Sequence, residues 1–350
     1  MVILWFLVRS MSRHPYAGLP DERFWNRAVA GRTREDLTLL YKKRFSIGPT
    51  QRIASAGSCF AQHITTHMRD RGYRILDMEP PPQGMSKRRF HEFGYRLYSA
   101  RYGNIYTARH LLQLAKEALG RWTPADGVWE RDGAYFDAMR PTVEPRGLES
   151  SEEVFAHRRE HLKQVRSVLR HADVFVFTFG LTEAWEHQAS GTVYPVAPGV
   201  VAGSFDPAVY RFINLSAGSV FDDFSSFREI VKEINPECKF LVSVSPVPLI
   251  ATASHHHVLR ATMSSKSALR TAAEMLFETF EDVDYFPSYE LISSPYFTTP
   301  FSEDMRSVSP IAVDAAMAMF FEQHQAPVAP SKKRSRQDTV CDENLIKAFT

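Results

Sequence analysis

The sequence predicts an α/β fold in which a parallel sheet is covered by helices on both faces. Short runs of apolar, β-branched and aromatic residues alternate along the chain with longer stretches of helical periodicity, an order typical of parallel sheets. Three of the four runs are nearly continuous in hydrophobic residues, as expected of strands that are buried on both faces. The composition agrees with this class, because 44% of the 350 residues are hydrophobic and 23% are charged, which excludes extensive disorder.

In the first half of the chain, the predicted strands are 52–56 (RIASA) and 174–178 (VFVFT). Three helices are predicted between them. Helical periodicity covers 60–71, strong helix formers fill 107–119 (TARHLLQLAKEAL), and 152–171 is a long, charged, amphipathic stretch.

In the second half, a strand at 240–244 (FLVSV) lies between helices at 221–234 and 264–280. A strand at 283–286 (VDYF) and a helix at 310–321 complete the alternation. Sheets of this kind carry their sites in the loops at the carboxyl ends of the strands, so we expect the functional residues there.

Two stretches do not fit the alternation and are predicted as loop insertions, either lids over a site or surface additions. Residues 77–100 contain three consecutive prolines and a basic-aromatic patch, and residues 185–220 are rich in Gly, Pro and Ser. We assign one α/β domain to 14–325, a flexible, basic, Pro-rich linker to 326–336, and a short amphipathic docking segment to 337–350.

The N-terminus begins with an apolar run, MVILWFLV, that ends at Arg9. It lacks the preceding basic residues and the cleavage site of a signal peptide, and it is far shorter than the ~20 residues of a membrane helix. We interpret 1–13 as either a mis-assigned start, with Met11 as the true first residue, or a short membrane-surface anchor.

The charge and the cysteines exclude several classes of function. A formal net charge of +2 argues against a nucleic-acid partner, and no segment predicts stable membrane insertion. Cys59, Cys238 and Cys341 are too few and too far apart for a disulfide framework or a thiolate zinc cage. We therefore expect a cytoplasmic protein without metal or cofactor, and the oligomeric state stays open.

The most informative segment is RIASAGSCFAQHI, residues 52–64. A strand ends in small residues, turns through Gly57, and presents Ser58 and Cys59 where a helix begins. A nucleophile at this place would lie beside the unpaired amides of the helix start, which can form an oxyanion hole. The alternative is an ordinary strand-to-helix turn with Ser58 as the N-cap residue.

The string GSCFA, residues 57–61, is the motif of the GSCFA family of bacterial proteins, and the chain resembles this family. Further segments resemble it in the same order: YGNIYTARHLLQL (102–114), FDAMRPTVEP (136–145), FTFGLTEAW (177–185), SVSPVPLIAT (243–252), SKSALR (265–270) and YFPSYE (285–290). The family is similar to SGNH/GDSL-type hydrolases. The resemblance implies a flavodoxin-like three-layer α/β/α fold and a scaffold for ester chemistry, and it names no substrate.

Carried over by position, the SGNH pattern puts the nucleophile on Ser58 and the oxyanion-hole residues on Gly103 and Asn104. Its third block, usually Gly-x-Asn-Asp, is Gly-Leu-Thr-Glu in this chain, so the Asn amide is replaced by the hydroxyl of Thr182, followed by Glu183. In the alternative interpretation, Thr182 and Glu183 cap a following helix.

The fourth block departs from the pattern. SGNH enzymes have Asp-x-x-His near the C-terminus, with the histidine as the base, whereas Asp304 is followed here by Ser307. Only His324 lies further downstream in this region, and its position near a helix end suits a surface residue better than a base.

A serine without a base is a weak nucleophile, and the sequence suggests three solutions. One residue of His255, His256 and His257 could serve as the base, and His257 is favoured because a helical stretch follows it, with Asp304 or Glu183 orienting it.

In the second solution, Cys59 is the nucleophile of a thiol hydrolase. In the third, the protein binds a glycan or another ligand and catalyses nothing. Lys266 could bind an anionic group or a sugar hydroxyl, although a lysine near a helix start is usually solvated. The leading prediction is an ester hydrolase or O-acyltransferase that acts on a small ester or a carbohydrate through an acyl-enzyme on Ser58.

Overall fold

A computed structural model describes residues 14–33, 36–37, 40–324 and 345–346 of the chain. The N-terminal lead 1–13 and the linker 326–336 lie outside the described residues. So does the docking segment 337–350, including Cys341, except for residues 345–346.

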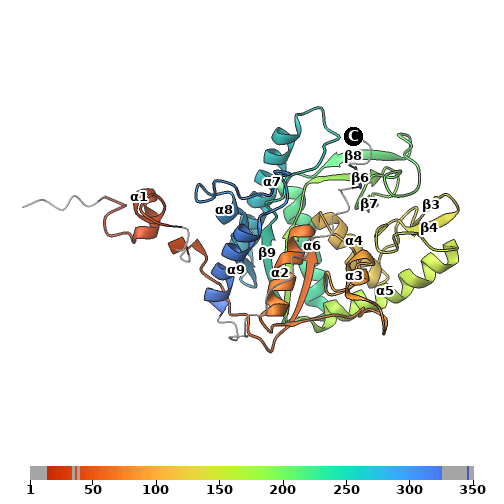
Figure 1. The fold of residues 1–350 in the computed structure, drawn as a ribbon, viewed down its shortest axis with the longest axis horizontal. Helices are drawn as coiled ribbons and strands as arrows, with labels where there is room; N and C mark the ends of the chain where they lie inside the picture. Colours follow the sequence, from red (N-terminus) through yellow and green to blue (C-terminus); the bar gives the residue numbers. More distant parts are fainter. Residues whose placement is uncertain (1–13, 34–35, 38–39, 325–344, 347–350) are drawn as a thin grey trace, which may run out of the picture.

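Five parallel strands form the central sheet (Figure 1), in the order β2 (Arg74–Ile75), β1 (Arg52–Gly57), β5 (Val174–Phe179), β9 (Lys239–Val244) and β10 (Val283–Tyr285). Counted along the chain, the spatial order is 2-1-3-4-5, the flavodoxin-like doubly wound arrangement. This confirms the predicted fold. The order reverses between β1 and β5, whose carboxyl ends are level because Gly57 pairs with Thr178.

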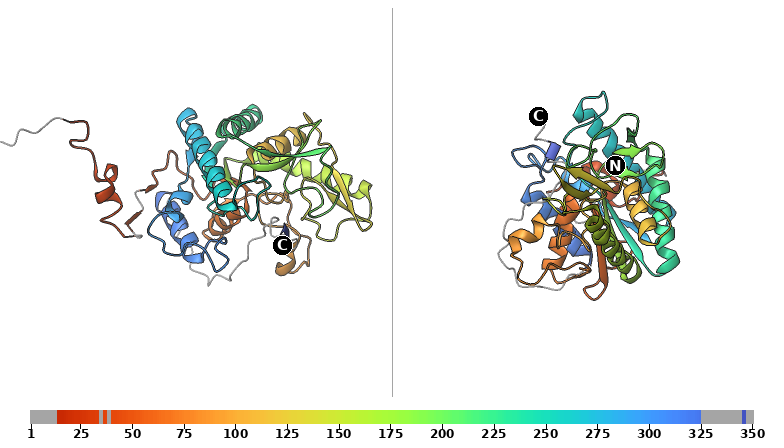
Figure 2. Two further views of the ribbon diagram at one scale, coloured as in Figure 1. Left: turned by 90° about the horizontal axis from the view of Figure 1, so that it is seen from above. Right: turned by 90° about the vertical axis from the view of Figure 1, so that its right-hand side faces the viewer.

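Helices cover both faces of the sheet (Figure 2). One face carries α2 (Cys59–Asp70), α8 (Ser288–Ile292) and α9 (Pro310–His324), and the other carries α4 (Ala108–Ala118), α5 (Ser151–His171), α6 (Ala217–Ile234) and α7 (Val258–Thr279). The predicted helices agree with these to within a few residues, with α7 beginning six residues earlier than expected.

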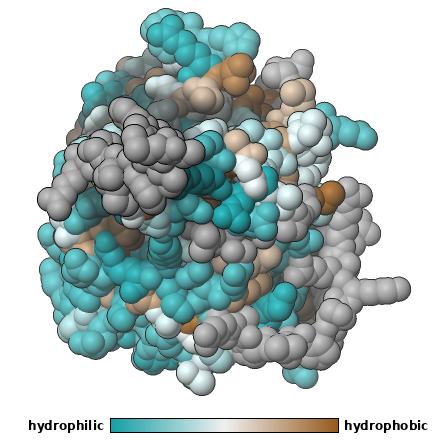
Figure 3. Space-filling view, turned by 90° about the vertical axis from the view of Figure 1, so that its left-hand side faces the viewer, coloured by the Kyte–Doolittle hydropathy of each residue, from teal (hydrophilic) through white to brown (hydrophobic). Residues whose placement is uncertain are grey.

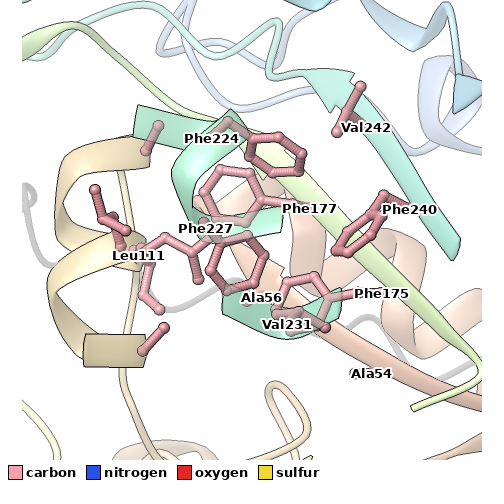
Figure 4. Packing of buried hydrophobic residues seen from close by; sticks show 14 of the residues in the cluster. Ala54, Ala56, Leu111, Phe175, Phe177, Phe224, Phe227, Val231, Phe240 and Val242 are labelled. Atoms are coloured by element: carbon pink, nitrogen blue, oxygen red, sulfur yellow. The ribbon is translucent and has the colours of Figure 1, made fainter. Parts of the chain in front are cut away.

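The strands bury both faces, as their continuous hydrophobicity predicts. Successive residues of a strand point to opposite faces, so Ile53 packs toward α2 and α9 while Ala54 packs toward α4 and α6. On the second face, Phe175 and Phe177 of β5 meet Phe224 and Phe227 of α6 (Figure 4). Each fully buried phenylalanine contributes about 1.5–3 kcal/mol to this core.

Residues 185–220 are not a loop insertion. They contain most of an antiparallel sheet in the order β7-β6-β8, formed by β6 (Glu183–His187), β7 (Val193–Tyr194) and β8 (Tyr210–Asn214). These strands are short and carry polar residues, so their periodicity is weak.

Several other short elements were not predicted, among them a short helix and a hairpin. The stretch 77–100 contains the short helix α3 (Lys87–Glu92). A hairpin of β3 (Val128–Arg131) and β4 (Ala134–Asp137) turns through Asp132 and Gly133, both with positive φ, which is the Asp-Gly signature of a tight hairpin.

The short helices η1 (Asp21–Arg23) and α1 (Trp25–Ala28) lie at the periphery, away from the central sheet (Figure 1). The face on this side of the molecule is mostly hydrophilic, with small separated apolar areas (Figure 3). No helix in the described part of the chain has the length and hydrophobicity needed to cross a membrane.

Candidate functional site

The site is built around the turn from β1 into α2. Gly57 has φ +138, and a Cβ atom there would lie 2.6 Å from the carbonyl oxygen of Thr178, so only glycine fits. Ser58 is the N-cap residue of α2, but its side chain makes no capping hydrogen bond. The residue is 2% exposed, and its hydroxyl has no hydrogen-bond partner among the described residues. Buried hydroxyl groups normally make hydrogen bonds, so helix capping does not explain why a serine stands at this position.

The segment of Gly103 and Asn104 lies beside this turn. The Ile105 N–H donates to the Gly57 carbonyl oxygen at 2.9 Å, and the Gly180 N–H donates to the Tyr106 carbonyl oxygen at 2.9 Å. The segment therefore runs between the ends of β1 and β5. Gly103 is buried with φ +68, and its N–H finds no partner within the described parts of the chain.

The side-chain amide of Asn104 is held in one orientation. Its Oδ1 accepts hydrogen bonds from Gln62 Nε2 at 3.0 Å and from the Tyr98 hydroxyl at 2.6 Å. Tyr98 Oη also lies 2.9 Å from the carbonyl oxygen of Ser58. This arrangement fixes the opposite side of the Asn104 amide, Nδ2, as its donor side. The sequence analysis missed Gln62 and Tyr98, although Gln62 follows Ser58 by four residues and so shares its face of the helix.

Two expected donors are used elsewhere. The Ser58 N–H donates to the Thr178 carbonyl oxygen at 3.1 Å instead of facing the site. The Thr182 hydroxyl donates to Asn214 Oδ1 at 2.6 Å, and the Thr182 N–H donates to Ser265 Oγ at 3.0 Å. The alternative that Thr182 and Glu183 cap a helix is wrong, because a strand, β6, follows.

Gly180, at the end of β5, is in close contact with Ser58. A Cβ atom on Gly180 would lie 2.9 Å from Ser58 Cβ and 3.1 Å from Tyr106. The carbonyl oxygen of Gly180 accepts a hydrogen bond from Lys266 Nζ at 2.6 Å. Lys266, on α7, is only 2% exposed, so the expectation of a solvated lysine is wrong.

The two candidate carboxylates have other partners. Asp304 closes its own turn, where its Oδ2 accepts from Ser307 Oγ at 2.7 Å and its Oδ1 accepts from the N–H groups of Arg306 and Ser307. Glu183 is buried and accepts from Thr252 Oγ1 at 2.7 Å, and burial raises the pKa of its carboxyl group.

None of the three candidate histidines is hydrogen-bonded to Ser58, whose hydroxyl has no partner among the described residues. His257 is exposed at the start of α7, where its Nδ1 accepts the N–H of Leu259 at 3.2 Å. His255 is exposed, and its ring lies 4.2 Å from that of His256. The prediction of a surface position for His324 is wrong, since it is 3% exposed.

The two cysteines in the described residues are buried and form no disulfide. Cys59 is the first residue of α2. Cys238 is fully buried just before β9, and burial raises the pKa of its thiol to about 12. Within the described ranges, no three His, Cys, Asp or Glu side chains are grouped so that they could hold a metal ion.

The comparison with protein families agrees with the motifs. The model of the GSCFA family matches residues 52–320. A search of curated proteins found no match. Two solved structures are similar. The Clostridium thermocellum family 3 carbohydrate esterase is 10% identical, with 78% of this chain and 94% of that chain covered and a TM-score of 0.26. A Corynascus thermopiles (Myceliophthora fergusii) carbohydrate esterase family 2 enzyme with a carbohydrate-binding domain is 12% identical. The match covers 79% of this chain and 67% of that chain, with a TM-score of 0.27.

Proposed function

The chain belongs to the GSCFA family, and on this basis we propose that it is an ester hydrolase or O-acyltransferase that forms an acyl-enzyme on Ser58. The observation that supports the proposal best is the buried, unpartnered hydroxyl of Ser58 at the carboxyl end of β1. It lies next to the point where the strand order reverses, the usual place of ligands in sheets of this topology. Ser55, Ser225 and Ser288 also have buried hydroxyl groups without a partner among the described residues, and Ser58 differs from them in its position at this turn.

In the proposed reaction, Ser58 Oγ attacks the carbonyl carbon of an ester and the alcohol leaves. The negative charge on the carbonyl oxygen is stabilised by two donors, the Gly103 N–H and Asn104 Nδ2. Water or an acceptor hydroxyl then attacks the acyl-enzyme and releases Ser58. We propose a small ester or an acylated carbohydrate as the substrate, and the acceptor decides between hydrolysis and transfer.

Substrate access requires movement of the residues around the serine, because the hydroxyl is buried in this conformation. Such opening steps often limit the rate of an enzyme. We therefore expect slow turnover of generic esters, with single-turnover labelling as the more sensitive measurement.

The test uses a fluorophosphonate probe and p-nitrophenyl acetate with the full chain. We expect the wild type to be labelled on the peptide that contains Ser58, and the Ser58→Ala variant to lose both labelling and esterase activity. Ser55→Ala is the matched control, because Ser55 lies on β1 three residues before Ser58, is 2% exposed and also has an unpartnered hydroxyl in the described structure. It should be labelled like the wild type.

Other outcomes overturn the proposal. Labelling that survives in Ser58→Ala but disappears in Cys59→Ala, together with inactivation by iodoacetamide, identifies a thiol hydrolase. A wild type that neither hydrolyses esters nor reacts with the probe supports the binding protein instead.

A further inference from the structure

Resting on the proposed ester chemistry, we propose that Lys266 is the general base of Ser58, in the place of the missing histidine. Its amine is held at Gly180, the residue whose Cα packs against Ser58. Lys266 of α7 and Ser58 of the β1 turn thus contact the same glycine, and a small movement of either side chain has to bring Nζ to Ser58 Oγ, which has no hydrogen-bond partner in this conformation among the described residues.

The position of Lys266 on α7 is unusual for a lysine. The buried stripe of this helix is otherwise formed by small, apolar and hydroxyl side chains at helical spacing: Ala261, Thr262, Ser265, Leu269, Ala272, Ala273 and Leu276. A leucine or methionine would fit such a stripe without loss of solvation. A lysine in this place costs stability, and function is the usual reason for keeping a buried lysine.

The other candidate groups named by the sequence are committed elsewhere. His257 uses Nδ1 to cap α7 at the surface, and Asp304 closes an exposed turn. Glu183 is buried, but it accepts a hydrogen bond from Thr252, in the loop that precedes α7. Among these candidates, Lys266 is hydrogen-bonded to Gly180, which is in contact with Ser58.

The chemistry requires the neutral amine, and burial is how proteins make a lysine a base at moderate pH. A neutral amine can donate N–H groups to acceptors such as the Gly180 carbonyl oxygen and still accept a proton from Ser58 through its lone pair. The Ser58 hydroxyl proton passes to Nζ as Oγ bonds to the ester carbon. The resulting ammonium protonates the leaving alkoxide oxygen, and the amine then accepts a proton from the water or acceptor hydroxyl that breaks the acyl–Oγ bond. When that bond breaks, the ammonium returns a proton to Ser58 Oγ.

The test compares Lys266→Met, Lys266→Arg and Lys266→Ala with the wild type. We expect Met and Arg to lower kcat/KM for p-nitrophenyl acetate by about 10²–10⁴-fold, the usual contribution of a general base. The alkaline increase of kcat/KM should disappear in both variants. Added methylamine should restore part of the activity of Lys266→Ala, with larger rescue as more of the added amine is deprotonated.

A purely structural tether gives different results. If Lys266 only holds the Gly180 carbonyl, Lys266→Arg retains activity within about threefold of the wild type, and amines rescue nothing. Either result overturns the role of Lys266 as the base. The proposed function is tested separately, and it stands as long as the probe labels Ser58 in the wild type. If instead Ser58→Ala equals the wild type, the proposed function itself fails. Circular dichroism and the Tm of each variant show that it is folded, and Lys266→Met should melt no lower than the wild type.

Discussion

Ser58 and Ser55 each have a hydroxyl that is buried and without a partner among the described residues, as do Ser225 and Ser288. A buried polar group in this state costs the folded protein about 1–3 kcal/mol. Proteins accept such costs at functional positions, where a group must be available to the substrate and not to its neighbours.

The first prediction concerns stability at this residue. Ser58→Ala should leave the free energy of unfolding unchanged or raise it by up to about 1 kcal/mol, because it removes an unsatisfied hydroxyl. Ser99→Ala is the contrasting control, since Ser99 Oγ accepts the Ser55 N–H at 2.9 Å and its loss leaves a buried donor unpaired. That variant should lose about 1–3 kcal/mol. Urea denaturation of the three proteins measures both effects, and a Ser58→Ala variant as destabilised as Ser99→Ala would contradict the interpretation.

The second prediction concerns the oxyanion donors. Asn104→Ala should lower kcat for an acyl ester by about 10²–10³-fold, the loss seen when one oxyanion-hole donor is removed. Tyr98→Phe keeps the ring but removes the hydroxyl that holds Asn104 Oδ1, so it should cause a smaller loss with the same sign. Steady-state kinetics separate kcat from KM. An Asn104→Ala variant with the kcat of the wild type would exclude this residue from the oxyanion hole.

At the scale of single residues, the sequence identified those site residues that lie within short family motifs. Ser58, Gly103 and Asn104 are in contiguous family motifs, and the structure places them on neighbouring segments. Gln62, Tyr98 and the burial of Lys266 were not foreseen, because they depend on which way a side chain points once helices pack. One signal was available for Lys266, which lies four residues after Thr262 and three before Leu269 on a helix that buries that face.

Among the elements, the end of β5 is the one that controls the site. The chain leaves the sheet through Gly180, which is in contact with Ser58 and also accepts a hydrogen bond from Lys266 of α7. The N–H of Thr182 is fixed by Ser265, also on α7. The second half of the fold therefore determines the surroundings of a serine that lies more than a hundred residues earlier in the sequence.

The third prediction tests this contact. Gly180→Ala puts a methyl group 2.9 Å from Ser58 Cβ, so it should lower the fluorophosphonate labelling rate at least about tenfold and cost about 1–3 kcal/mol of stability through overpacking. Gly218→Ala is the matched control, because it lies in α6 and the nearest atom to its Cβ would be 3.8 Å away. It should keep full activity and gain slightly in stability. Normal labelling of Gly180→Ala would show that Ser58 does not depend on this contact.

The elements differ in how far the sequence predicts them. Strands such as 174–179 are found easily, because burial on both faces makes them continuous in hydrophobic residues. The sheet of β6, β7 and β8 was missed because its strands are short and polar, and because its pairing joins residues far apart, such as Glu183 and Asn214. Long-range pairing of this kind leaves little local signal.

At the scale of the whole molecule, the buried His324 connects distant segments of the chain by hydrogen bonds. His324, at the end of α9, accepts the Ile47 N–H through Nδ1 at 3.1 Å, and its Nε2 lies 2.9 Å from the Tyr41 hydroxyl. That hydroxyl in turn donates to Asp284 of β10 at 2.9 Å. This geometry needs a neutral imidazole, because a proton on Nδ1 would face the N–H of Ile47.

The last prediction follows from this state. Burial lowers the pKa of His324 to about 3, and burial also lowers the pKa of His110, on α4, to about 4, against an ordinary value of 6.5. The unfolded chain therefore binds more protons than the folded one below pH 6.5. The stability that these neutral histidines contribute is fully present above pH 6.5 and decreases as the pH falls toward their folded values, by up to about 1.4 kcal/mol per histidine per pH unit.

Urea denaturation between pH 7.5 and 5 measures this slope before most carboxylates titrate. His324→Gln should be less stable than the wild type at pH 7.5, because it disturbs the hydrogen bonds to Ile47 and Tyr41, and its stability should depend less on pH. His171→Gln, at an exposed position on α5, is the control and should follow the wild-type curve. If His324→Gln keeps the full wild-type slope, the acid sensitivity comes from other groups. In that case, protonation of His324, more than 260 residues from Ser58 in the sequence, does not determine how the stability of the fold depends on pH.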